Sequence, residues 1–285
     1  MKNALKSLLA IYGVLLLSAC ENKVEVTTPT TPKLDRFENI VNSGVLRCGY
    51  QYWDGGLYQD DQTGELKGFM VDVTEALGTV LDLKIEWTAV IDWGLISTEL
   101  NTNKIDTFCA AVWLSGKNTK TMLVSDAIAY NGFEAFVRGD DNRFDNDWRK
   151  LNDPSVIMAI IENTSSGFIS QRILPNASPY GLPPIASTDL DLALNVATGK
   201  ADVAFTNPGI LVSYMKQNPG NIKRVRPGEP FAYMGLTYPV QQDSFRTLHM
   251  INTGIKELQN TGVINQLIEK YNVSYPEMFL ESAGS

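Results

Sequence analysis

The spacing of hydrophobic residues changes several times along residues 34–129. Apolar positions recur every three or four residues at 69–81, which predicts a helix, and they alternate or run together at 45–48 and 83–90, which predicts strands. A further strand is expected over 105–112. Strands that alternate with helices of this length predict right-handed βαβ units and a mostly parallel sheet.

A second series of the same kind follows over 130–235. Its first strand, 156–161, is apolar at every position, as expected for a strand buried on both faces. The polar turn 162–167 leads into a helix, Thr188 is placed to cap the next helix, and 201–205 predicts another strand. Beyond this series the pattern predicts one more strand and two C-terminal helices.

Two extended segments, near 127–134 and 230–233, join the two series. We therefore expect an α/β fold of two lobes: lobe 1 from 34–129 plus 236–285, and lobe 2 from 130–235 with hinge strands at its ends. In open α/β sheets, ligands bind beyond the carboxyl ends of the strands. Two such lobes facing each other form a cleft that a hinge at the two crossings can close.

The N-terminal pattern differs from that of the body. Two lysines precede a mostly apolar run of about ten residues, far below the ~20 residues of a membrane-spanning helix, and this order predicts a signal peptide over 1–19. The sequence Leu17-Ser18-Ala19-Cys20 resembles the bacterial lipobox, which implies that Cys20 is lipidated. The alternative is an ordinary signal peptide followed by a chance cysteine. Residues 20–33 are polar and rich in Thr and Pro, which predicts a flexible tether.

The composition is acidic. The formal net charge of −8 becomes −10 when the two lysines of residues 1–19 are removed. An acidic surface without basic runs argues against nucleic acid and against binding to an anionic membrane surface. No second hydrophobic run reaches spanning length, so we expect a soluble body tethered to a membrane by its lipid.

Cysteine and histidine are scarce. Cys48 and Cys109 remain once Cys20 is lipidated, and an even pair in an oxidising envelope permits a disulfide. Both lie in strand-like runs, which suits two buried free thiols equally, and we favour free thiols. His249 is the only histidine, so zinc sites and Ser-His-Asp or Cys-His catalysis are excluded, and we expect no cofactor.

Six short motifs occur in the order typical of one family. They resemble the signatures of family 3 extracellular solute-binding proteins, the amino-acid-type receptors of ABC importers. The motifs are Gly64-x-x-x-Gly68-Phe69-x-Val71-Asp72, Asp92-Trp93, Asn103-Lys104-Ile105-Asp106, Ser125-Asp126, Gly199-Lys200-Ala201-Asp202, and Gly262-Val263-Ile264 with Lys270-Tyr271. The resemblance covers roughly residues 34–275. It implies a two-lobed periplasmic-binding-protein (type II) fold, a monomer in the periplasm or at the cell-envelope surface, a small-molecule ligand and an inner-membrane ABC permease as partner.

The resemblance also implies a set of ligand-binding positions. Carried over to this sequence, they are Tyr50, Trp53, Trp93, Ala111, Trp113, Ser115, Asn118, Thr164, Ser165, Ser166 and Asn207. Two of them depart from the family. Members that bind α-amino acids carry an arginine in place of Asn118, which clamps the carboxylate, and an aspartate in place of Asn207, which holds the ammonium. Lys117 lies one position early, is not forked and is a poor substitute for arginine.

Losing both partners indicates a ligand other than an ordinary zwitterionic amino acid, because a desolvated ammonium without a counter-charge is strongly penalised. Trp53, Trp93 and Trp113 are placed to form an aromatic box for a quaternary ammonium or a flat ring, with Glu162 near by as a negative charge. The alternative is that some of these tryptophans only pack in lobe 1.

Two groups at helix starts have alternative readings. Ser165 and Ser166 either cap a helix or present its N–H groups to an anion, and the two roles are compatible. Asn207, which precedes a proline, is equally suited to cap a helix.

We expect a tethered binding protein that does no chemistry on its solute. One alternative is a sensory or scaffolding protein that binds without transport. Another is an enzyme, because some relatives on this fold are dehydratases of cyclohexadienyl acids. That chemistry needs an acid, for which Glu162 is a candidate, and cations for the carboxylates. No arginine falls in the predicted cleft.

Overall fold

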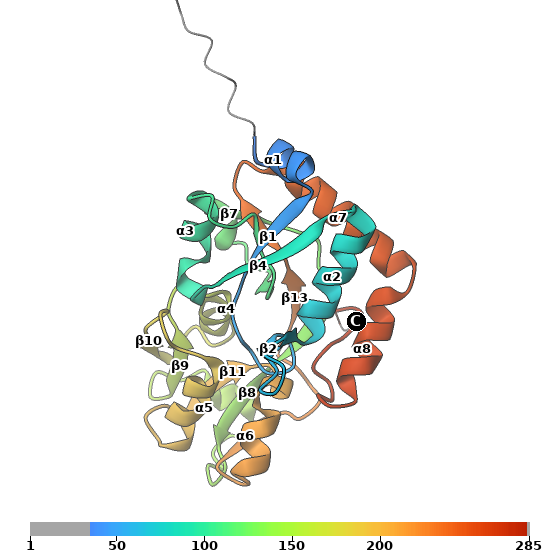
Figure 1. Ribbon diagram of the computed structural model, residues 1–285. Coiled ribbons are helices and arrows are strands. Elements are labelled where there is room, and N and C mark those ends of the chain that lie inside the picture. Colours follow the sequence, from blue (N-terminus) through green and yellow to red (C-terminus); the bar gives the residue numbers. More distant parts are fainter. Residues whose placement is uncertain (1–34, 284–285) are drawn as a thin grey trace, which may run out of the picture. The chain divides into compact units, whose positions relative to one another are not determined.

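The computed structural model describes residues 35–283 (Figure 1). The predicted signal peptide, the lipidated Cys20 and the tether lie outside these residues. No helix within 35–283 combines the length and the apolar character that crossing a bilayer requires.

Lobe 1 is built on a five-stranded sheet with strand order β4-β1-β5-β14-β7. The strands β4, β1 and β5 are parallel, and β14 runs antiparallel to both of its neighbours. The strands are β1 (Val45–Tyr50), β4 (Lys84–Val90), β5 (Thr107–Phe108), β7 (Met122–Val124) and β14 (Pro239–Gln241), with a small hairpin of β2 (Tyr58–Gln59) and β3 (Leu66–Lys67) beside them.

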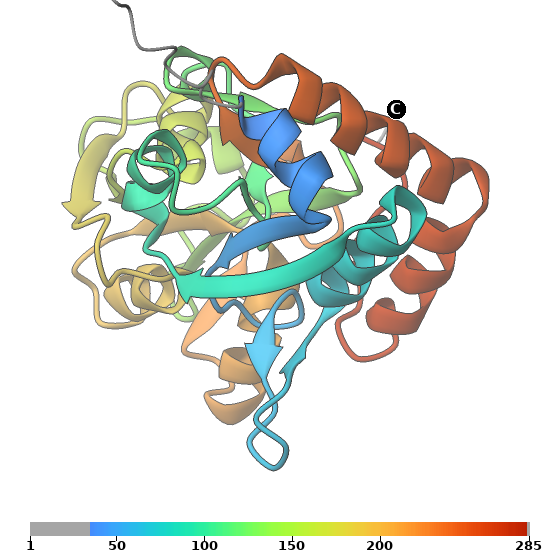
Figure 2. The same cartoon turned by 45° about the horizontal axis from the view of Figure 1, so that its top comes forward.

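Helices cover this sheet. They are α1 (Arg36–Ser43), α2 (Phe69–Leu81), α3 (Ile96–Asn101), α7 (Phe245–Asn260) and α8 (Val263–Asn272), with 3₁₀ turns η1 (Trp93–Leu95) and η2 (Asn118–Lys120). The C-terminal helices α7 and α8 lie beside α2 (Figure 2). The Asp72 carboxylate joins α2 to α8 by accepting hydrogen bonds from Lys270 and Tyr271. One hydrophobic cluster fills the space between α1, α2, α7, α8 and the sheet, and a second includes the buried residues of α3.

Lobe 2 is built on a second sheet with strand order β10-β9-β11-β8-β13-β6, in which β12 also pairs with β8. Its β10, β9 and β11 are parallel, and the other pairs are antiparallel. The strands are β6 (Val112–Trp113), β8 (Tyr130–Arg138), β9 (Ile157–Ile161), β10 (Ser178–Leu182), β11 (Val203–Thr206), β12 (Ile222–Arg224) and β13 (Ala232–Thr237).

The helical segments of lobe 2 are α4 (Ser165–Ile173), α5 (Asp189–Ala197), α6 (Val212–Gln217), η3 (Trp148–Leu151) and η4 (Pro208–Leu211). Two hydrophobic clusters lie in this lobe. The two crossings between the lobes lie side by side, because β8 and β13 pair antiparallel from Ala232↔Phe133 to Gly235↔Tyr130. The expected two-lobed α/β architecture with two crossings is therefore confirmed.

The strand expected over residues 105–112 is interrupted. Pairing in the first sheet is limited to β5, and β6 pairs with β13 in the second sheet instead. Between them Ala111 adopts a left-handed backbone with φ of 63°, which costs a residue with a side chain roughly 1 kcal/mol. This turn carries the chain out of the first sheet and toward the crossing strands.

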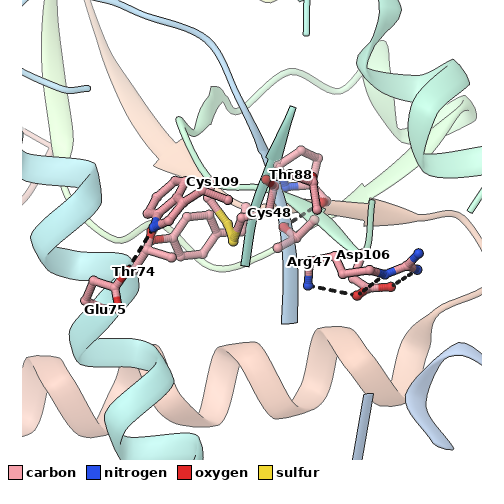
Figure 3. Close-up of a disulfide and its surroundings, with 11 residues drawn as sticks. Arg47, Cys48, Thr74, Glu75, Thr88, Asp106 and Cys109 are labelled. Carbon is pink, nitrogen blue, oxygen red and sulfur yellow. Dashed lines mark hydrogen bonds and ion pairs between the residues drawn. A yellow bond between two sulfur atoms is a disulfide. The ribbon is translucent and has the colours of Figure 1, made fainter. Parts of the chain in front are cut away.

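Cys48 and Cys109 form a disulfide (Figure 3). Cys48 lies on β1 and Cys109 directly follows the neighbouring parallel strand β5; Cys48 is opposite Thr107, and the Cys109 N–H donates to the Gly49 carbonyl. Residues two apart on a strand share a face, so both sulfurs point to the same side. Their Cα atoms are 5.4 Å apart, within the usual range for a disulfide. The expectation of free thiols is wrong.

Candidate ligand-binding site

A cavity of about 150 Å³ lies between the two lobes. Its walls come from η1, α3 and the loop around Ala111 on one side and from the starts of α4 and α5 on the other. Eight of the residues predicted for the site line it: Trp53, Trp93, Ala111, Trp113, Asn118, Thr164, Ser165 and Ser166. The structure does not bring Tyr50, Ser115 and Asn207 to this lining.

The three tryptophans line the same cavity, and hydrogen bonds or ring packing hold each of them in place. The Trp53 indole N–H donates to the Ala110 carbonyl over 3.0 Å, and that of Trp113 donates to Asn131 Oδ1 over 2.9 Å. Trp93 packs edge-on against Phe108 with ring centroids 5.4 Å apart. Because the indole N–H groups of Trp53 and Trp113 already have partners, these two rings add apolar surface to the cavity.

Asn118 connects the two lobes directly. Its amide Nδ2 donates to the Ser165 hydroxyl over 2.7 Å. The preceding Lys117 does not line the cavity, because its ammonium lies over the Phe168 ring, 3.6 Å from the centroid. Lys117 therefore does not take the place of a carboxylate-binding arginine.

The start of α4 is capped by Thr164. Its hydroxyl accepts from the Gly167 N–H over 3.2 Å and lies 3.0 Å from the Ser166 hydroxyl. The alternative in which Ser165 and Ser166 cap this helix is wrong, because both residues already belong to its first turn. Both serines line the cavity.

Asn207 has a structural role. It is fully buried, its amide donates to the Gly132 carbonyl over 3.0 Å, and its Oδ1 accepts from the Gly209 N–H over 2.8 Å. These bonds cap η4 and tie it to β8 and to the C-terminal segment. Asn207 stands at the sequence position where family members carry the ammonium-binding aspartate, but its side chain does not line the cavity.

Tyr50 and Ser115 also lie outside the lining. The Tyr50 ring packs edge-on against Tyr52 and Trp87. Ser115 is buried, and its backbone carbonyl accepts from the Asn118 N–H over 3.1 Å. Both residues support the loops that carry the lining residues.

The sequence analysis missed Asp189, which lines the cavity at the first position of α5. Its Oδ1 accepts from the Thr206 hydroxyl over 2.5 Å. Burial raises the pKa of this carboxyl, and the bond from Thr206 opposes the shift. The predicted Glu162 is exposed and does not line the cavity. The signal that identifies Asp189 is its place after β10, at the carboxyl edge of the parallel strands, where ligands bind.

Two α/β lobes joined by two crossings, with a lined cavity between them, define a two-lobed solute-binding protein. The comparisons identify its family. The chain belongs to the bacterial extracellular solute-binding proteins, family 3, whose sequence model matches residues 50–274.

The chain is also similar to a curated relative and, in fold, to solved structures. The chain is 25% identical over 265 residues to the probable amino-acid-binding protein YxeM of Bacillus subtilis (strain 168), and this match covers 90% of each protein. The solved structure of the ancestral amino acid-binding protein AncCDT-1, a precursor of cyclohexadienyl dehydratase, has a TM-score of 0.67 at 22% identity and covers 82% of this chain and 98% of that one. The cysteine-binding protein from Campylobacter jejuni has a TM-score of 0.68 at 14% identity and covers 87% of this chain and 100% of that one. The fold is the type II periplasmic-binding-protein fold.

Proposed function

We propose that this protein captures a small amino-acid-like solute in the cavity between its lobes and delivers it to an ABC-type permease in the inner membrane. The observation that carries the proposal is a cavity lined from both lobes, in a fold whose two crossings allow the lobes to close on a ligand. Binding and release are then the whole task of the protein, with no chemical step.

The cavity favours a small ligand that is not a standard zwitterion. Its volume of about 150 Å³ resembles that of a cavity that accepts benzene in another protein. Among the described residues, its lining contains no arginine, lysine or histidine to pair with a carboxylate. The relatives include proteins named for amino-acid and L-cystine binding, so an amino-acid derivative without the usual pair of charges fits both observations.

The N-terminal part of the proposal rests on residues 1–33. We propose a signal peptide over 1–19, a lipid on Cys20 and a tether to residue 33, on the strength of the Leu17-Ser18-Ala19-Cys20 sequence. The mature chain is expected in the membrane fraction, with a lipid-sized mass increase on the peptide that begins at Cys20. In a Cys20→Ser variant both the mass increase and the membrane association should be lost.

Two other functions are less well supported. A dehydratase needs an acid and cations at the substrate carboxylates, but Glu162 is exposed and the described cavity wall has no cationic side chain. A sensory or scaffolding protein has the same cavity and differs only in its partner. If a permease gene lies beside this gene, transport is favoured over sensing.

A thermal-shift screen tests the proposal. The solutes are the common amino acids, betaines, polyamines and aromatic acids, since a ligand at 100 times its dissociation constant adds ~2.7 kcal/mol to the free energy of unfolding. We expect stabilisation by a small solute and little effect of glutamine, arginine or glutamate. A clear shift with any of those three overturns the ligand preference, and the absence of a shift with every solute contradicts solute binding.

A further inference from the structure

The described cavity wall contains an acidic side chain but no basic one. Among the described residues that line it, Asp189 is the one carboxylate, and there is no lysine, arginine or histidine. The neighbouring charges are used elsewhere: Lys117 lies over Phe168, and Asp191 accepts from the Thr188 backbone and hydroxyl. The described lining therefore has one carboxylate and no cationic side chain to balance it.

Asp189 is held in place by its own lobe. Its Oδ1 accepts from the buried Thr206 hydroxyl, and its position at the start of α5 faces the positive end of the helix dipole. These contacts favour the ionised form, while burial raises the pKa of the carboxyl. Asp189 is half-buried, and a partly desolvated carboxylate without a cation is costly in free energy. A positively charged ligand removes this cost when it binds.

Aromatic rings line other parts of the cavity wall. Trp53, Trp93 and Trp113 line the cavity, and the indole N–H groups of Trp53 and Trp113 are bonded to Ala110 and Asn131. Aromatic faces attract organic cations, and the attraction grows when the cation is desolvated. The volume of about 150 Å³ accommodates a small cation.

We propose that Asp189 is the anionic anchor of the binding site and that the ligand is a small organic cation, an amine or a quaternary ammonium, held between this carboxylate and the tryptophans. The proposal rests on the proposed solute-binding function and specifies the ligand class. It places the cation partner on α5, because Asn207, on the loop after β11, is buried and faces other groups.

The test compares cations with a neutral molecule of the same shape. Dissociation constants are measured by tryptophan fluorescence for choline, tetramethylammonium and butylammonium, and for 3,3-dimethylbutan-1-ol, in which carbon replaces the choline nitrogen. The wild type should bind at least one of the cations, and should prefer choline to its neutral counterpart by at least about 30-fold. The Asp189→Asn variant keeps an acceptor for Thr206 and should lose most of this preference.

The matched control is Asp191→Asn, which removes a negative charge from the same helical turn but from a side chain that caps the helix instead of lining the cavity. It should bind like the wild type, and equal losses in both variants overturn the anchor role. The proposal is also overturned if none of the three cations binds, or if choline and its neutral counterpart bind the wild type equally. In those cases, a solute that binds in the broader screen still supports the solute-binding function. If no solute binds in either experiment, both the binding function and the Asp189 anchor are rejected.

Discussion

The two walls of the cavity differ in kind. The lobe 1 wall is mainly aromatic and apolar, with Trp53, Trp93, Ile96 and Met122, beside the polar Ser97, Asn118 and Thr121. The lobe 2 wall is mainly polar around the starts of two helices, with Asn163, Thr164, Ser165, Ser166 and Asp189, beside the apolar Ile161 and Ile210. An apolar wall binds any small body that fits it, because burial of apolar area is non-directional. A polar wall selects by charge and by hydrogen-bond direction. We therefore expect lobe 1 to contribute mainly affinity and lobe 2 mainly selectivity.

The walls also differ in how they are supported. The lobe 1 wall continues directly from Cys109, since Ala110 and Ala111 line the cavity, and the disulfide fixes this point to β1. The lobe 2 wall is held by helix caps, with Thr164 at α4 and a capping box of Thr188 and Asp191 at α5. A covalent link and a hydrogen-bonded cap respond to different perturbations, so the two walls can be tested separately.

Reduction of the disulfide should have the largest effect. The cross-link closes a loop with a sequence separation of 61 residues, for which loop entropy gives a stabilisation of about 4 kcal/mol. Urea unfolding with and without a reductant, or with a Cys48→Ser, Cys109→Ser variant, measures the loss. The reductant should leave the double variant unchanged. A loss below about 1 kcal/mol would show that the lobe 1 wall does not depend on the cross-link.

Truncation of Trp113 should weaken ligand binding next most strongly. Trp113→Ala removes the ring that lines the cavity and packs on Phe133, and loss of a central tryptophan costs about 2 kcal/mol or more, roughly 30-fold in affinity. Titration calorimetry with a solute found in the screen measures the change. Trp148→Ala is the matched control, because Trp148 packs on Phe231 and does not line the cavity. Equal losses in both variants would remove Trp113 from the site.

The sequence predicted the elements of both walls better than their details. Periodicity and turn residues were sufficient for the alternating strands and helices, because those patterns are local. The disulfide was misjudged because the neighbouring positions of Cys48 and Cys109 depend on which strands pair, and the order β4-β1-β5 is not visible in either strand alone. Ala111 was predicted for the site and lines the cavity, but its left-handed turn was not foreseen, since alanine carries no signal for positive φ.

The same limit explains the errors on lobe 2. Asn207 and Asp189 both stand at helix starts, and either is a plausible cap or a plausible ligand partner on sequence alone. Which of them faces the cavity depends on how η4 and α5 are oriented against β8 and the C-terminal segment. Glu162 was suggested as a negative charge near the tryptophans, yet its side chain is exposed and lies outside the lining.

The charge on the polar wall should make the empty protein less stable at neutral pH. Burial raises the pKa of Asp189 in the folded state. When the carboxyl ionises above that pKa, the folded protein is therefore less stable. This destabilisation disappears as pH falls below the unfolded pKa. Asp189→Asn should therefore be more stable than the wild type at neutral pH, and the difference should shrink in acid. Thermal unfolding across pH 3–8 measures it, with Asp191→Asn as the control. A wild type that is more stable than Asp189→Asn at neutral pH would mean that the carboxylate has a cation partner in the empty protein.

The contact between the walls should have the smallest effect. The Asn118–Ser165 bond joins η2 to α4 over 2.7 Å, and a single hydrogen bond of this kind contributes about 1 kcal/mol. A double-mutant cycle of Asn118→Ala and Ser165→Ala, read from urea unfolding, should give a coupling energy of that size.

Thr119→Ala is the control, because the Thr119 hydroxyl bonds to Gly116 within its own loop. It should not couple to Ser165→Ala. If the bond holds the walls together without a ligand, both alanine variants should bind solute more weakly, because part of the ligand's binding energy is then needed to close the lobes. A coupling near zero with unchanged solute affinity would mean that this bond does not determine closure. Closure would then depend on other contacts between the lobes, such as Lys117 with Phe168, and on the ligand between the aromatic and the polar wall.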